Sequence, residues 1–155
     1  MTSGRHVPTV ARVTNTNNSV DLPIAGEPAR WSVAGKFLEA LSVRDYERLA
    51  ASLHEGVHFR ALLPPGSWEW EGRDEAAAAF RAWFGAAERF EVVDATVGDV
   101  GGRLQMTWRI RMRPAPFDIG EGWYLIEQHA FADAADTIEA LDLVCSGFRA
   151  EPTSE

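Results

Sequence analysis

The sequence predicts an α+β fold in which a curved, mostly antiparallel sheet packs against three helices. Apolar residues recur at helical spacing in the first half of the chain and with a period of two in the second half. Helices grouped before strands favour this class over an alternating α/β fold. At 155 residues with 46% hydrophobic content, the chain can bury the core of a single domain.

Three segments have the pattern of amphipathic helices. The first follows Pro28, a residue suited to a helix start, and has one apolar stripe: Trp31, Ala34, Phe37, Leu38 and Leu41. In the second, Asp45 is a plausible N-cap, and the predicted buried face is Tyr46, Leu49, Ala50 and Leu53. The third covers 73–84, is rich in alanine and ends at Gly85.

Six segments have the pattern of strands. Two come before the third helix, and the "PPG" at 64–66 separates them because proline cannot donate to a sheet ladder. The other four follow that helix: 90–97, 103–113, 123–131 and 137–145. The irregular segment 114–122, with two prolines and two glycines, is a candidate lid.

We expect one folded domain over 28–150, preceded by a flexible N-terminal arm at 1–27 and followed by a short tail at 151–155. The arm is rich in Thr, Asn, Ser, Pro and Gly and has no sustained hydrophobic period.

Composition excludes several classes of function. A formal net charge of -8 gives no attraction for nucleic acid or for anionic membranes. The single cysteine, Cys145, fits a reducing compartment, and no segment resembles a signal peptide or a membrane span. We therefore expect a cytoplasmic protein with no nucleic-acid or membrane partner. No ligand set with credible spacing is present, so we expect no metal and no cofactor.

Three features together resemble a known family: the order of elements, the helix "GRDEAAAAFRAWF" after "WEWEG", and the closing "IEALDLVCSGFR". Residues 28–150 resemble the nuclear transport factor 2-like superfamily, in its SnoaL-like and ketosteroid-isomerase-like branch. The resemblance implies a cone-shaped sheet wrapped around the helices, an apolar pocket for a small molecule, and a homodimer formed through the sheet. Members include isomerases, polyketide cyclases, dehydratases and non-catalytic proteins.

Two of the three residue roles of a standard ketosteroid isomerase are not filled here, and the nearest match to the third, the acid that donates to the oxyanion, is Glu127 or His129. Ala61 or a neighbouring leucine stands where the resemblance places the general base, and Trp31 and Phe37 stand in the helix that should supply a tyrosine. This argues against that activity.

Glu127 and His129 are the first candidates for proton transfer. They lie two residues apart in "WYLIEQHAF" and therefore share one face of the strand. An ion pair of Glu127 with Arg109 or Arg111 of the preceding strand is an equally good interpretation. The opposite face of that preceding strand is apolar, and we favour it as the lining of the cone: Leu104, Met106, Trp108, Ile110 and Met112.

Asp142 and His58 are the alternative catalytic candidates, although a lone strand histidine is more often a structural residue. The residues expected to hold the substrate are mainly aromatic: Phe37, Phe59, Trp68, Trp70, Trp83, Met106, Trp108 and Ile110. Cys145 is interpreted as a small buried hydrophobe.

Two hypotheses follow. The first is an acid/base enzyme, of cyclase, isomerase or dehydratase type, acting on an apolar or polycyclic molecule. The second is a non-catalytic ligand-binding or dimerisation module, which a cavity without inward titratable groups would favour.

Overall fold

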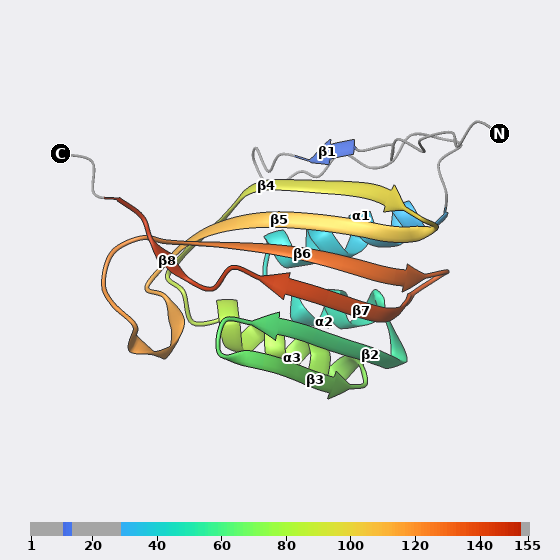
Figure 1. Cartoon of the computed structure of the whole chain (residues 1–155), viewed down its shortest axis with the longest axis horizontal. Helices are drawn as coiled ribbons and strands as arrows, with labels where there is room; N and C mark the ends of the chain where they lie inside the picture. The colour runs from blue at the N-terminus through green and yellow to red at the C-terminus, as the bar shows by residue number, and fades with distance from the viewer. Residues whose placement is uncertain (1–10, 14–28, 153–155) are drawn as a thin grey trace.

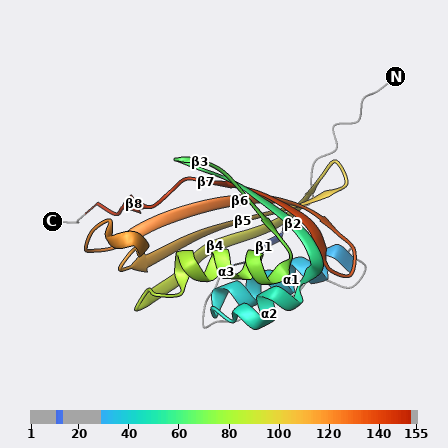
Figure 2. The ribbon, with the colours of Figure 1, turned by 90° about the horizontal axis from the view of Figure 1, so that it is seen from below.

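The computed structural model describes residues 11–13 and 29–152. A strongly curved sheet forms one layer and three helices lie against its concave face (Figure 2). The described strands form one eight-stranded sheet with the order β1-β4-β5-β6-β7-β2-β3, and β8 pairs with β6 (Figure 1). The predicted α+β architecture is confirmed.

The helices begin and end close to the predicted positions. They are α1 (Ala29–Ser42), α2 (Tyr46–Ala51) and α3 (Arg73–Phe84). The Asp45 side chain caps α2, as predicted, by accepting a hydrogen bond of 3.1 Å from the backbone N–H of Arg48. The prediction that Leu53 belongs to the second helix was wrong, because α2 ends at Ala51 and Leu53 begins the next strand.

The six predicted strands are all present, and three of them are longer than predicted. They are β2 (Leu53–Leu63), β3 (Gly66–Glu71), β4 (Arg89–Val100), β5 (Arg103–Arg113), β6 (Tyr124–Ala134) and β7 (Ile138–Cys145). Neighbouring strands pair antiparallel except β2 and β7, which are parallel. The short 3₁₀ helix η1 (Pro116–Asp118) lies in the connection between β5 and β6.

Two short strands extend the sheet at the ends of the chain. The predicted arm at 1–27 falls mostly outside the described residues, but β1 (Ala11–Val13) pairs antiparallel with β4. Near the other end, β8 (Arg149–Ala150) pairs with the start of β6, and Glu151 accepts a hydrogen bond of 2.9 Å from the Arg111 side chain. Short edge pairings of this kind are not visible in a hydrophobic pattern.

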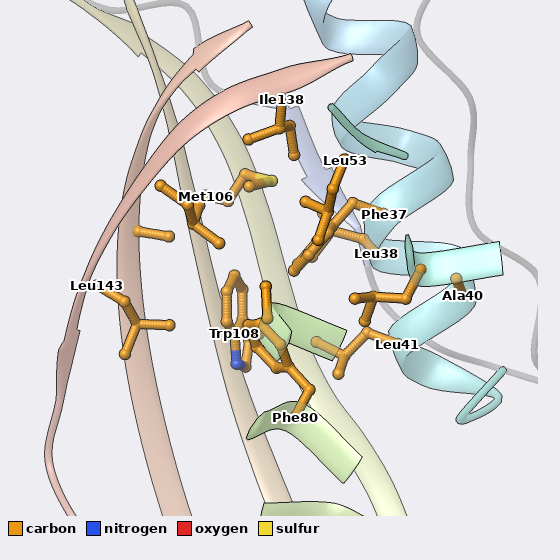
Figure 3. Close-up of a cluster of buried hydrophobic side chains, with 14 of the residues drawn as sticks. Phe37, Leu38, Ala40, Leu41, Leu53, Phe80, Met106, Trp108, Ile138 and Leu143 are labelled. Atoms are coloured by element: carbon orange, nitrogen blue, oxygen red, sulfur yellow. The ribbon is translucent and has the colours of Figure 1, made fainter. Parts of the chain in front are cut away.

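The core lies between the helices and the concave face of the sheet (Figure 3). Trp108 of β5 points toward Phe37 of α1 and Phe80 of α3, with ring centroids 5.6 and 6.3 Å away. The apolar face of β5 therefore faces the helices, as favoured from the sequence, and the arginine face is the outer, convex surface. None of the described helices has the length and hydrophobicity to cross a membrane.

Candidate functional site

A cavity of about 450 Å³ opens at one end of the concave face. Five segments meet around it: the β2–β3 turn, the last turn of α3, the loop after β5, the start of β6, and the β7–β8 link. The residues that line it are Leu63, Pro64, Pro65, Trp83, Phe117, Ile119, Ile126, Cys145, Ser146, Gly147 and Phe148. This volume is within the usual range for small-molecule sites.

The wall of this cavity is almost entirely apolar. Among the described residues that line it, there is no Asp, Glu, His, Lys or Arg, and Cys145 is the one titratable side chain. The polar groups are the Ser146 hydroxyl, which donates to the backbone oxygen of Gly147 at 2.9 Å, and backbone groups. A wall of this composition favours a neutral, mostly apolar ligand, because a charged ligand would be desolvated without a partner.

The loop after β5 forms part of the mouth. Phe117 has 70% of its surface exposed and a φ of 64°, an uncommon conformation for a bulky residue, and Ile119 is 47% exposed. The hydroxyl of Tyr124 donates to the Ile119 backbone oxygen at 3.3 Å and ties the loop to β6. Both exposed side chains contribute to the cavity wall, and the interpretation of 114–122 as a lid stays a prediction.

A buried carboxamide lies next to the cavity wall. Gln128 is completely buried on the concave face of β6, one pleat along from Ile126. Its Oε1 accepts a hydrogen bond of 2.7 Å from the indole N–H of Trp108, and its Nε2 lies 3.4 Å from the Sγ of Cys145. The sequence analysis missed Gln128, although the strict alternation of β6 puts it on the face opposite Glu127 and His129.

Glu127 and His129 lie on the convex face, away from the cavity. The Arg109 guanidinium binds the Glu127 carboxylate at 2.9 Å, and Nε2 of His129 lies 3.6 Å from its other oxygen. The hydrogen bond from Arg109 lowers the pKa of Glu127 below its usual value, and partial burial opposes this shift. The structure thus brings the two predicted residues together, and the cross-strand pairing considered as the alternative is present.

Asp142 and His58 are also on the convex face, in separate clusters. Asp142 accepts hydrogen bonds from Arg60 at 2.7 Å and Arg103 at 3.1 Å. The Arg60 hydrogen bond is the main cause of its lowered pKa, with Arg103 adding to it and partial burial opposing it. His58 pairs with Glu71 across the β2–β3 ladder. No group of three or more His, Cys, Asp or Glu in the described part of the chain could hold a metal ion.

The residues expected to hold a substrate are divided between three environments. Trp83 lines the cavity, and Trp70 is half-buried, with its ring stacked on Phe59 at 4.7 Å. Five are fully buried in the core and do not line the cavity: Phe37, Phe59, Met106, Trp108 and Ile110. Trp68 is 51% exposed and contributes to a second, convex-side groove of about 330 Å³, which Arg60, Leu62, Asp142 and Val144 also line.

The profile of the SnoaL-like domain matches residues 34–140. The chain belongs to the SnoaL-like domain family. The resemblance stated from the sequence is thereby confirmed. A search of curated proteins found no match to this SnoaL-like chain.

Solved structures share the fold of this SnoaL-like domain. A candidate polyketide cyclase from Xanthomonas campestris pv. campestris is 18% identical, with 75% of this chain and 89% of that chain covered and a TM-score of 0.59. A phenazine biosynthesis-related protein from Pseudomonas aeruginosa is 11% identical, with 76% and 81% covered and a TM-score of 0.60. A candidate ketosteroid isomerase from Kribbella flavida is 17% identical, with 79% and 82% covered and a TM-score of 0.50. At these identities the likeness shows the fold.

Proposed function

We propose that this SnoaL-like chain binds a small, neutral, mostly apolar molecule in the cavity at the open end of its sheet. The observation that carries the proposal is the composition of the wall, which is apolar apart from Cys145, Ser146 and backbone groups. Burial of ligand surface against such a wall gives a favourable free energy of about 25 cal/mol per Å². The four predicted acid/base residues all lie outside it, which favours a binding module over an acid/base enzyme.

The test compares two substitutions at adjacent positions of β7. Cys145→Phe places a ring in the cavity, whereas Val144→Phe adds the same ring on the convex face, where Val144 is 49% exposed. Equilibrium dialysis against tetralin, a bicyclic hydrocarbon, measures the dissociation constant.

We expect Cys145→Phe to weaken binding about tenfold or more and Val144→Phe to leave it unchanged, since a ring in the cavity competes for the ligand's volume. Equal affinity of both variants for tetralin, with each variant shown to be folded by circular dichroism, would show that the cavity is not the binding site.

Enzymatic turnover is the second candidate, because solved structures of the same fold include candidate polyketide cyclases. In that case Glu127 and His129, with their contact of 3.6 Å, would be the proton-transfer pair, and Asp142 or His58 the alternative. A substrate would then have to approach the convex face. Loss of turnover of a polycyclic ketone in Glu127→Gln, with ligand binding in the cavity unchanged, would favour this candidate.

A homodimer formed through the convex face is also part of the proposal. Leu62 and Val144 are exposed there between the ion pairs of Asp142 and Glu127, so the face has both apolar and charged groups to offer a second copy. In analytical ultracentrifugation, we expect the wild type to sediment as a dimer and Val144→Arg to sediment as a monomer. A cytoplasmic location stays a prediction from the sequence.

A further inference from the structure

The strand β3 forms a free edge of the sheet. The order of the described strands ends with β3 on one side, whereas β4 on the other side is partly covered by β1 (Figure 1). A three-residue extended segment therefore already pairs with the opposite edge. β3 pairs with β2 over six consecutive positions without a bulge, and it contains no proline, so it lacks two of the features that block further pairing at an edge.

The hydrogen bonding of the β2–β3 ladder shows which backbone groups face the free side. The N–H of Gly72 donates to the backbone oxygen of Val57 at 2.8 Å, and hydrogen-bonded pairs alternate with non-hydrogen-bonded pairs along an antiparallel ladder. The residues of β3 whose backbone groups face outward are therefore Ser67, Glu69 and Glu71. In agreement, the N–H of Glu71 donates to the Glu75 side chain at 3.1 Å. The N–H and C=O groups of Ser67 and Glu69 are left without a partner among the described residues.

One face of β3 is acidic. Glu69 and Glu71 lie two residues apart on this face, with 64% and 71% of their side chains exposed. The residues opposite them in β2 are Arg60 and His58. The Arg60 guanidinium binds Asp142 at 2.7 Å, and the single imidazole of His58 lies between the two carboxylates. These groups leave the acidic face with negative charge available to a basic partner.

The other face of β3 is aromatic. Trp70 stacks on Phe59 with a distance of 4.7 Å between ring centroids, and this contact holds it against the core. The alternation of the strand puts Trp68 on the same face as Trp70, and Trp68 is 51% exposed. An exposed indole offers a large apolar surface to an aliphatic side chain of an added strand. A strand that fits both faces alternates basic and apolar residues.

We infer that the free edge of β3 docks an extended segment of a partner protein in which basic and apolar residues alternate. The segment adds to the sheet as an antiparallel strand along residues 67–71. Its basic side chains lie opposite Glu69 and Glu71, since cross-strand pairs share one face of a sheet. A second copy of β3 is disfavoured, because antiparallel pairing centred on Glu69 would place two carboxylates directly opposite each other. The inference does not depend on a ligand in the cavity.

The probe is the peptide acetyl-KVKVT-amide, whose central lysine would lie opposite Glu69. NMR titration of the full chain, followed through its backbone amide signals, measures the dissociation constant. Two N-methylated peptides are the matched controls. A methyl group on the central lysine nitrogen removes a donor that faces β3, whereas one on the adjacent valine nitrogen alters a group that faces away. We expect the first to weaken binding about fivefold or more and the second to change it by less than about twofold.

Charge reversal tests the acidic face. Glu69→Lys should weaken the binding of acetyl-KVKVT-amide about fivefold and strengthen that of acetyl-KVEVT-amide by a similar factor, the value of a cross-strand charge pair. Glu121→Lys is the control, because it changes the net charge by the same amount at an exposed position in the connection between β5 and β6. It should leave both affinities unchanged. Equal effects of the two substitutions would show non-specific attraction and overturn the inference.

Hydrogen exchange of the backbone amides of Ser67 and Glu69 is a second readout. The peptide should slow exchange at both, because their N–H groups enter a new ladder. Absence of binding at about 1 mM peptide, or equal affinity of the two N-methylated peptides, would overturn the inference. Exchange at these amides that slows with rising protein concentration alone would show that a second copy occupies the edge, and would overturn it as well.

Discussion

The hydrogen bond between Trp108 and Gln128 can be measured by a double-mutant cycle. It joins adjacent strands at 2.7 Å, and both side chains are buried, with 1% and 0% of their surface exposed. Trp108→Phe removes the donor, Gln128→Met removes the acceptor, and the double variant removes both. The cycle separates the hydrogen bond from the other contacts of each side chain.

Each single substitution leaves a buried partner without its hydrogen bond, which costs about 1–3 kcal/mol of unfolding free energy. Trp108→Phe also loses packing against Phe37 and Phe80, so its total cost should be about 2–4 kcal/mol. The double variant has no orphaned partner. Its cost should therefore be smaller than the sum of the single costs, by about 1–2 kcal/mol.

Urea unfolding monitored by circular dichroism measures all four free energies. Costs that add to within about 0.5 kcal/mol would show that the two groups do not interact, and would refute the orientation of Gln128 that its hydrogen bond with Trp108 defines. Additivity would also contradict the assignment of its amide nitrogen to the side of Cys145.

Two further predictions concern the loop and the convex face. Phe117→Ser should weaken tetralin binding several-fold, because it removes an aromatic part of the cavity wall. The free energy of unfolding should change by less than about 0.5 kcal/mol, because Phe117 is 70% exposed. Unaltered binding would show that the loop does not contact the ligand. Asp142 has a lowered pKa in the folded protein, so its ion pairs stabilise the fold above its ordinary pKa of about 3.9, and this stabilisation is lost as the pH falls through the folded-state value. In thermal unfolding, Asp142→Asn should therefore be less stable than the wild type at pH 7, and the difference in stability should shrink below about pH 4. A difference that does not depend on pH would contradict the role of Arg60 and Arg103.

Most of the fold could be predicted from hydrophobic periodicity. The alternation of apolar and polar residues in 103–113 predicted both the strand and the face that packs on the helices. The Asp45 cap predicted the start of α2. The boundary at Leu53 could not be predicted, because a leucine at the end of a helical pattern is equally suited to the first position of a buried strand. Pairing of the short β1 and β8 depends on tertiary contacts that leave no periodic signal.

The candidate site was predicted less well, for a reason that Gln128 illustrates. Glu127 and His129 were predicted because their side chains can titrate. Side chains of a strand alternate between its two faces, so Gln128, which lies between them, is on the concave face. The cavity is formed where the "PPG" turn, Trp83 and Phe148 meet, and their proximity depends on the parallel pairing of β2 with β7. Such a pairing between distant strands is not encoded in any local pattern.

The most direct test of ligand binding in the cavity is an NMR measurement of contacts between bound tetralin and methyl groups of the protein. Leu63 and Ile126 line the concave-side cavity, whereas Leu62 and Val144 line the convex-side groove. Leu62 and Leu63 report on opposite faces of β2, and Ile126 and Val144 report on opposite faces of the neighbouring strands β6 and β7. We predict nuclear Overhauser effects from the ligand to Leu63 and Ile126 and none to Leu62 and Val144. Contacts with Leu62 and Val144 instead would contradict the proposed site and place the ligand beside Asp142.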